Sequence, residues 1–200
     1  MRSLPLTVFV AALALGAQAI AQDETTSIAS TQFSTNQRGD SILSLSLGTA
    51  VPLGWYNPNT ALFETANATP GFAFALSYAW FLNEDWALAV DLAGEYVGTV
   101  NDRQLFIAPL SLRAFRAFPV GPFLIAPTAG LGVAISALDS FKHVDPLFKA
   151  GTSVLWRASS DMSYTFNLYG NVIPQIFSDY PENSRVGFFM EATLAVAYHL

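Results

Sequence analysis

The chain has 200 residues, a formal net charge of −6 and no cysteine. The acidic balance, without any cluster of Lys and Arg, excludes a nucleic-acid-binding surface, and the lack of cysteine excludes disulfides, thiolate metal sites and an acylated-cysteine anchor. Charged residues make up only 12% of the chain, against about a quarter in soluble domains. Something other than water is therefore expected to cover part of the surface.

The N-terminus has the features of a secretory signal. A short basic start is followed by an almost wholly apolar run at residues 4–15 and by the small residues of Ala17-Gln-Ala-Ile-Ala21. This pattern predicts a cleaved signal peptide at residues 1–21, then a polar segment at 22–40 and one domain at 41–200.

From residue 41 onward, bulky apolar residues alternate with small or polar ones. In Phe72-Ala-Phe-Ala-Leu-Ser-Tyr-Ala-Trp80 every even position is bulky and every odd position is small, the period of two that a β-strand imposes. The pattern predicts strands at about residues 41–53, 71–82, 86–98, 105–118, 122–136, 147–158, 163–176 and 186–200.

The connections between these segments alternate in length. Short turns are expected at 83–85, 119–121 and 159–162, and longer loops at 54–70, 99–104, 137–145 and 177–185. Such alternation is typical of an all-β fold in which eight antiparallel strands form an up-and-down transmembrane β-barrel. Both termini are then expected at the short-turn end.

Aromatic residues on the bulky face gather at two levels, with aliphatic residues between them. Two aromatic girdles around an aliphatic belt are typical of a surface that meets both interfaces of a membrane, which predicts that the bulky face contacts lipid. The girdle near the short turns contains Trp80, Trp86, Phe118, Phe123, Trp156, Tyr164 and Tyr198, and the opposite girdle contains Phe72, Tyr96, Phe106, Phe148 and Phe188.

The other face of the strands should line a narrow lumen that side chains fill. Because an isolated charge there would be costly, we predict an ion pair between Asp91 and Arg113, which the hairpin brings opposite each other, and we expect Asn171 near Glu191. The network either satisfies buried charge or gates ions. Its predicted members are Asp91, Glu95, Arg113, Lys149, Arg157, Asn167, Asn171 and Glu191.

Some residues fit these strands badly, and few carry catalytic chemistry. Pro109, Pro127 and Pro174 fall inside predicted strands, where bulges or strand ends are expected because proline lacks the N–H that the ladder uses.

No catalytic, cofactor or metal site is predicted. Asp139, His143 and Asp145 would make at best a weak metal site, and their segment is interpreted as a solvated loop.

From about Ser41 to Leu200 the chain resembles the small eight-stranded outer-membrane barrels of diderm bacteria, the class that contains the OmpA transmembrane domain, OmpX and OmpW. The resemblance rests on the alternating segments, the two girdles and the last strand, where Leu194, Val196 and Tyr198 alternate as in the assembly signal of that class. The chain departs from the class by ending in leucine. The resemblance implies insertion into the bacterial outer membrane by the barrel-assembly machinery, and it assigns no activity.

The sequence thus predicts a non-enzymatic outer-membrane barrel with a structural, surface-interaction or narrow-channel role, in contact with outer-membrane lipids and with an extracellular ligand at its long loops. One alternative is a conduit or binder for small apolar solutes, with residues 55–63 as its entrance. A second is an outer-leaflet lipid-modifying enzyme that uses Ser140 and His143. A third is a soluble lipocalin-like periplasmic barrel, which would need the bulky face inside.

Overall fold

The computed structural model describes residues 36–99, 103–138, 141–177 and 181–200. The predicted signal peptide lies outside the described residues, as does most of the polar segment that follows it. A short 3₁₀ helix occupies Pro181–Asn183. The strands are β1 (Ser41–Asn57), β2 (Leu62–Thr65), β3 (Ala68–Phe81), β4 (Trp86–Thr99), β5 (Gln104–Arg116), β6 (Phe118–Val120), β7 (Phe123–Leu138), β8 (Phe141–Arg157), β9 (Met162–Gln175) and β10 (Arg185–His199).

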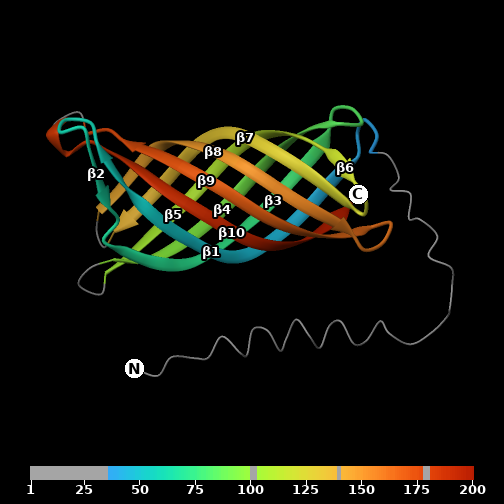
Figure 1. Cartoon of the computed structure of the whole chain (residues 1–200), viewed down its shortest axis with the longest axis horizontal. Coiled ribbons are helices and arrows are strands. Elements are labelled where there is room, and N and C mark those ends of the chain that lie inside the picture. The colour runs from blue at the N-terminus through green and yellow to red at the C-terminus, as the bar shows by residue number, and fades with distance from the viewer. Residues whose placement is uncertain (1–35, 100–102, 139–140, 178–180) are drawn as a thin grey trace, which may run out of the picture. The chain divides into compact units, whose positions relative to one another are not determined.

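Eight of the described strands form a closed antiparallel barrel. They follow the order β1, β3, β4, β5, β7, β8, β9 and β10, and β10 pairs again with β1 from Ile42↔His199 to Tyr56↔Val186 (Figure 1). The remaining two lengthen hairpins, because β2 pairs with the end of β1 and β6 with the start of β7. The predicted eight-stranded up-and-down barrel is confirmed. Among the described residues, no helix is long and apolar enough to cross a membrane.

The barrel has two distinct ends. The short-turn end carries the β3–β4 and β8–β9 turns and the C-terminus, and the long-loop end carries β2 (Figure 1). At the short-turn end, Gly121 adopts a φ of 58° in the turn between β6 and β7, a left-handed conformation that glycine reaches without steric cost.

Burial follows the sequence alternation, with bulky residues outside and small ones inside. In β3, Leu76 is 46% exposed while its neighbour Ala75 is 6% exposed. Across the strands the exposed face is mostly Leu, Val, Phe, Tyr and Trp. Contact of such an apolar surface with water is unfavourable, whereas contact with lipid is favourable. The lipocalin-like alternative, which needs the bulky face inside, is therefore wrong.

The loop predicted at 137–145 is wrong for its described residues, because β7 continues to Leu138, β8 begins at Phe141, and the two strands pair as far as Leu138↔Phe141. His143 and Asp145 lie in β8, opposite Ser136 and Ala134. The period of two continues here with polar residues on the inner face. The polar composition of this stretch is typical of a loop, although its backbone forms a strand.

The loop predicted at 54–70 is also partly strand. β1 continues to Asn57, and a bulge between Pro52 and Gly54 shifts its register against β10 by one residue. Because a one-residue shift reverses the facing of all that follows, Trp55 turns toward the lumen, whereas an uninterrupted alternation would direct it toward lipid. Its ring packs edge-on against Phe189 at a centroid distance of 5.7 Å.

The expected bulges at the three strand prolines do not occur. The register is constant through Pro127↔Thr152 and through Val186↔Pro174. At Pro109 the β4–β5 pairing is interrupted between Leu92↔Leu110 and Glu95↔Ile107 but resumes in the same register, as expected where one N–H donor is missing. Phe106 consequently keeps its outward facing.

Candidate functional site

The interior of the barrel at mid-height holds a cluster of charged side chains built around Arg113. Arg113 on β5 donates from Nε to Asp91 Oδ2 on β4 at 2.5 Å and from Nη2 to Asp91 Oδ1 at 3.0 Å. Its Nη2 also donates to Ser77 on β3 at 3.1 Å, and Ser111 donates to Asp91 at 3.3 Å. The predicted ion pair is present, and adjacent strands satisfy its remaining polar atoms.

A second group of polar contacts ties opposite walls together. Asn171 on β9 donates to Glu95 on β4 at 3.1 Å, and β4 and β9 are separated by three strands on either side of the barrel. Lys149 on β8 donates to Glu191 on β10 at 3.0 Å, across β9. Asn171, expected near Glu191, is thus bound to a residue of the far wall. The Asn171–Glu95 contact therefore crosses the lumen.

Tyr169 joins the two groups. Its ring lies 5.2 Å from the Arg113 guanidinium carbon and 4.8 Å from Lys149 Nζ, so one aromatic face contacts two cations. Its hydroxyl lies 2.6 Å from Ser153 Oγ and donates to Asn167 Oδ1 at 3.0 Å. We call the set Asp91, Glu95, Arg113, Lys149, Asn167, Tyr169, Asn171 and Glu191 the polar plug; each of them is buried.

The network predicted from the sequence contains every member of the polar plug except Tyr169. Arg157, predicted among them, lies apart at the short-turn end and donates to the Ser160 carbonyl at 2.9 Å. Tyr169 and the buried hydroxyl residues that contact the polar plug share the inward parity, because they alternate with lipid-facing neighbours. These hydroxyl residues are Ser77, Ser111, Thr128, Ser153 and Thr193.

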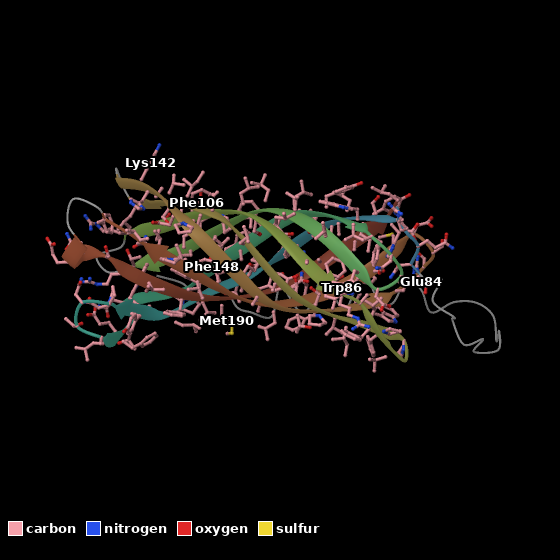
Figure 2. All side chains as sticks on the ribbon, turned by 90° about the horizontal axis from the view of Figure 1, so that it is seen from above. Glu84, Trp86, Phe106, Lys142, Phe148 and Met190 are labelled. Atoms are coloured by element: carbon pink, nitrogen blue, oxygen red, sulfur yellow. The ribbon has the colours of Figure 1, made fainter. Side chains whose placement is uncertain are left out.

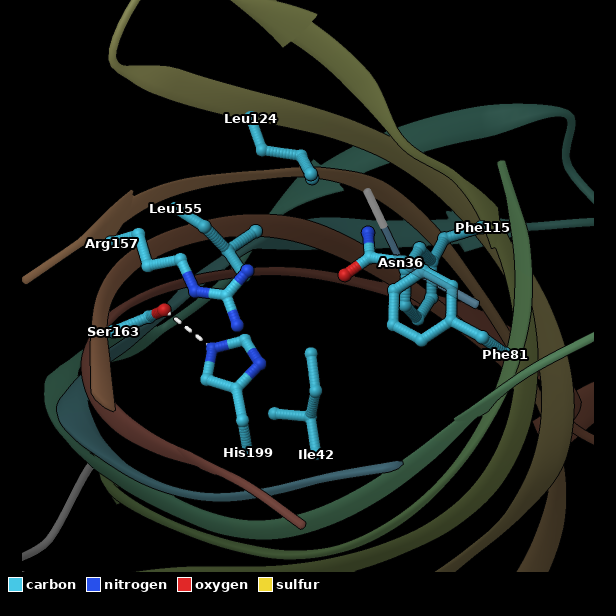
Figure 3. Close-up of a pocket in the computed structure, with 9 residues that line it drawn as sticks. All are labelled: Asn36, Ile42, Phe81, Phe115, Leu124, Leu155, Arg157, Ser163 and His199. Carbon is cyan, nitrogen blue, oxygen red and sulfur yellow. Dashed lines mark hydrogen bonds between the residues drawn. The ribbon is translucent and has the colours of Figure 1, made fainter. Parts of the chain in front are cut away.

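A small cavity of about 40 Å³ lies at the short-turn end, where Arg157 and Ile42 form part of its lining (Figure 3). Within it, Ser163 Oγ lies 2.6 Å from His199 Nε2. The cavity is too small for more than a water molecule or two. It therefore offers no room for an organic substrate beside the serine and histidine.

A larger cavity of about 350 Å³ lies at the long-loop end of the barrel. Its inner wall is made of bulky apolar residues in place of the small ones that line the middle of the lumen. Gly187 gives the Trp55 ring room, since a Cβ there would lie 2.6 Å from Trp55 Cζ3. We call this cavity the apolar cup; its lining is Trp55, Thr99, Leu105, Ile107, Ser136, Leu138, Lys142, His143, Ile173, Gln175, Phe177 and Phe189.

One side of the apolar cup carries linked polar side chains. His143 Nδ1 lies 2.6 Å from Asp145 Oδ1, and Gln175 Nε2 donates to Asp145 Oδ2 at 3.4 Å. The His143 ring also packs on Phe177 at 4.8 Å. Asp145 is 1% exposed at its side chain, so the solvated-loop interpretation of this segment is wrong.

Among the described residues, no three His, Asp or Glu side chains gather where a metal ion could bind. Two residues that the sequence analysis weighed for chemistry, Asp139 and Ser140, lie outside the described residues.

The aromatic side chains assigned to the girdles point outward, with Trp86 toward one end of the barrel and Phe106 toward the other (Figure 2). At the short-turn level, Arg116 pairs with Asp85 at 3.2 Å and lies over the Phe118 ring at 4.8 Å. The exposed members are Phe72, Trp86, Tyr96, Phe118, Phe123, Phe148, Trp156, Tyr164 and Tyr198, and the more buried ones are Trp80, Phe106 and Phe188.

A protein-family model matches residues 21–198, which is most of the chain. The fold is similar to that of Neisserial surface protein A, at 13% identity and a TM-score of 0.61 over 80% of this chain and 96% of that one. OprG from Pseudomonas aeruginosa is similar at 10% identity and a TM-score of 0.50, over 82% and 97%. The N-terminal barrel domain of OprF from the same organism shares 15% identity at a TM-score of 0.50, over 82% and 98%. No curated protein sequence matches the chain.

Proposed function

Because the chain belongs to a family of eight-stranded outer-membrane β-barrel proteins, we propose that it is a non-enzymatic barrel that binds a small apolar solute in the apolar cup. The single observation that carries this proposal is a cavity of about 350 Å³ with a bulky apolar lining at the long-loop end. In such barrels the longer loops face the cell exterior. The apolar cup would then open toward the outer surface of the cell.

The polar plug argues for a binding role over a channel role. Every strand of the barrel except β1 contributes a side chain to the contacts of the plug, and the Asn171–Glu95 hydrogen bond spans the diameter. A solute could cross this level only if several buried charged contacts broke together, each of which leaves an uncompensated group in a narrow interior. The plug therefore serves as the floor of the apolar cup.

The lining indicates the class of solute. A cavity of about 350 Å³ is at the lower end of the range of about 300–1,000 Å³ for small-molecule sites. An apolar solute gains little by leaving lipid for a protein cavity, since both are apolar. Selectivity must come from ring contacts with Trp55 and Phe189 and from a hydrogen bond to His143 or Gln175. The expected solute has an apolar body with one polar head.

Contact quenching of Trp55 tests this proposal. In a variant with Trp80, Trp86 and Trp156 changed to Phe, the probe 10-bromodecan-1-ol should quench Trp55 saturably, and unbrominated decanol should reverse the quenching. A matched variant that keeps only Trp156, which faces outward, should show quenching that rises with the probe in the lipid and does not saturate. Trp55 quenching that follows the Trp156 curve would contradict binding in the apolar cup.

The same proposal includes export and assembly. A cleaved signal at residues 1–21 and insertion by the barrel-assembly machinery would deliver residues 41–200 to the outer membrane as the barrel domain. We expect a gel shift between boiled and unboiled samples of the outer-membrane fraction. The measured mass of the mature protein should correspond to a chain that begins at Gln22. A freely soluble protein, or one that retains Met1, would contradict this part.

The non-enzymatic role is proposed because no nucleophile is joined to a base beside the apolar cup. Among the described residues, His143 contacts Asp145 through Nδ1 and packs on Phe177, and no serine or threonine hydroxyl is hydrogen-bonded to it. His143→Ala should therefore leave the lipid A of the host cell unaltered. A change in lipid A acylation on this substitution would favour the lipid-modifying alternative.

A further inference from the structure

An ion pair lies on the lipid-facing side of the barrel at the short-turn end, where Trp86 projects outward (Figure 2). Arg116, the last residue of β5, donates from Nη2 to Asp85 Oδ2 at 3.2 Å, and its guanidinium carbon lies 4.8 Å from the Phe118 ring and 6.0 Å from the Trp86 ring. A guanidinium has five N–H donors, and among the described residues this one accepts no partner but Asp85. All four side chains are accessible from outside the barrel, so the pair can bind a further charged group.

A row of small, outward-facing residues begins beside this pair. The row crosses four neighbouring strands in continuous register, and its members are Ala114 on β5, Ala129 on β7, Ala150 on β8 and Gly170 on β9. Ala114 lies close to Arg116 at the short-turn end of β5, whereas Gly170 lies in the middle of β9. The row therefore rises obliquely from the short-turn interface toward the middle of the membrane.

Two rows of bulky side chains border the small residues. Each bulky row pairs in register across neighbouring strands and so forms a continuous ridge on the outer wall. The ridge nearer the long loops is Leu112, Leu131, Phe148 and Val172. The ridge nearer the short turns is Phe118, Ile125, Val154 and Phe166. We call the space between the ridges the outer groove; its floor is Ala114, Pro127, Ala129, Ala150, Thr152 and Gly170.

The protein leaves the floor of the outer groove uncovered at Gly170. On β4, by contrast, the Phe74 ring covers Gly94, where a Cβ would collide with it. A Cβ at Gly170 would lie 3.8 Å from the nearest atom, the Ala150 carbonyl oxygen, so packing does not require glycine there. Three strand separations of about 4.8 Å give the row a length of about 14 Å, close to half of the ~30 Å hydrocarbon core. The outer groove therefore matches one acyl chain of one leaflet in length.

We propose that the Arg116–Asp85 pair and the outer groove together bind one phospholipid with a primary-amine headgroup, from the leaflet on the short-turn side. The phosphate accepts hydrogen bonds from the guanidinium N–H groups that Asp85 does not use, since arginine suits phosphate geometry. The ammonium donates to the Asp85 carboxylate and lies against the Trp86 ring. One acyl chain lies in the outer groove. This site is separate from the apolar cup and does not depend on the function proposed for it.

The two opposite charges select among headgroups. Ethanolamine carries an ammonium with N–H donors, so its phospholipid satisfies Arg116 and Asp85 at once. Choline carries a cation without any N–H and can only approach Asp85 electrostatically. Glycerol carries no cation, so its phospholipid leaves the Asp85 carboxylate facing the phosphate. The expected order of affinity is ethanolamine above choline and glycerol.

Native mass spectrometry of the purified protein in detergent tests this order, because it resolves each bound lipid by mass. With palmitoyl and oleoyl chains in every case, one phosphatidylethanolamine should bind about three- to five-fold more tightly than phosphatidylcholine or phosphatidylglycerol, the strength of about one exposed charge contact. Asp85→Asn should remove this preference. Arg116→Met should weaken the binding of all three lipids, because each contains the phosphate.

Ala150→Leu fills the outer groove and should weaken the binding of phosphatidylethanolamine about three-fold or more, with the headgroup contacts intact. Ala108→Leu is the matched control, since Ala108 is a partly exposed residue of β5 beyond the ridge of Leu112. Arg38→Met is the control for charge, because Arg38 is exposed at the same end of the barrel. Both controls should leave the dissociation constant unchanged. Folding of every variant is checked by the boiled-versus-unboiled gel shift.

Three results would overturn the phospholipid site. The first is equal affinity of the parent protein for the three lipids, which needs no variant at all. The second is unchanged affinity for phosphatidylethanolamine in Arg116→Met or in Ala150→Leu. The third is an equal loss of affinity in Ala108→Leu or Arg38→Met, which would attribute the effect to the lipid-facing surface in general.

Discussion

Removal of one partner from the Asp91–Arg113 pair should destabilise the barrel strongly. Arg113→Met keeps most of the side-chain volume but leaves Asp91 without its cation, and the two side chains are only 9% and 4% exposed. Two unit charges about 4 Å apart interact by about 4 kcal/mol at an effective dielectric constant near 20. Breaking a buried pair by removing one member costs about 3–5 kcal/mol, because the remaining charge is uncompensated.

A double-mutant cycle in lipid vesicles measures this effect. We expect Arg113→Met and Asp91→Asn each to lower the free energy of unfolding in urea by about 3–5 kcal/mol, and the double variant to lose clearly less than their sum. Arg116→Met is the matched control, since its pair with Asp85 is 46% and 49% exposed, and it should cost no more than about 1 kcal/mol. A loss below about 1 kcal/mol for Arg113→Met, or full additivity in the double variant, would refute a buried, coupled pair.

Three further outcomes follow from the lipid-facing surface and the polar plug. Leu92→Arg, in the middle of the aliphatic belt, should cost about 2–4 kcal/mol in the urea titration, whereas Val120→Arg, outside the belt in the β6–β7 hairpin, should cost about 0–1 kcal/mol; equal costs would contradict the membrane position. Tyr169→Phe loses the hydroxyl contacts but keeps the ring over both cations, so it should cost about 1–3 kcal/mol, and an unchanged urea midpoint would contradict the plug geometry. The parent protein should carry no steady current in a planar bilayer, and the double variant Glu95→Ala with Asn171→Ala should raise the current; a conducting parent would show that the plug does not close the lumen.

The alternating sequence predicted the facing of most strand residues because that property repeats every two residues and needs only local information. It failed where one extra residue entered the pattern. The bulge between Pro52 and Gly54 reverses Trp55 from the lipid side to the apolar cup. Proline and glycine are common at bulges, but they also occur in regular strands and turns, so their presence does not predict the register shift. His143 and Asp145 were placed in a loop because charged residues are rare in strands, although both lie on the inner face of β8.

The polar plug was largely predictable and the apolar cup was not. A charged side chain that points into the narrow lumen needs an opposite charge among the other inward side chains. The pairing of Asp91 with Arg113 could therefore be predicted from the hairpin alone. The apolar cup depends on which strands meet at one height, and therefore on register, which the alternation does not contain. Ile107, Ile173 and Phe189 come from three separate strands and gather only after the barrel has closed.

The hydrogen bond between Asn171 and Glu95 also has a mechanical consequence. A thin-walled cylinder resists flattening poorly unless its opposite walls are joined, and this contact joins them at mid-height. Among the described residues nearer the long-loop end, no side-chain hydrogen bond joins opposite walls, and the pairing of β8 with β9 ends at Phe148↔Val172. Lateral pressure from the bilayer should therefore deform the cross-section of the barrel less at mid-height than at the long-loop end. The thickness and tension of the host membrane should then influence the shape of the apolar cup.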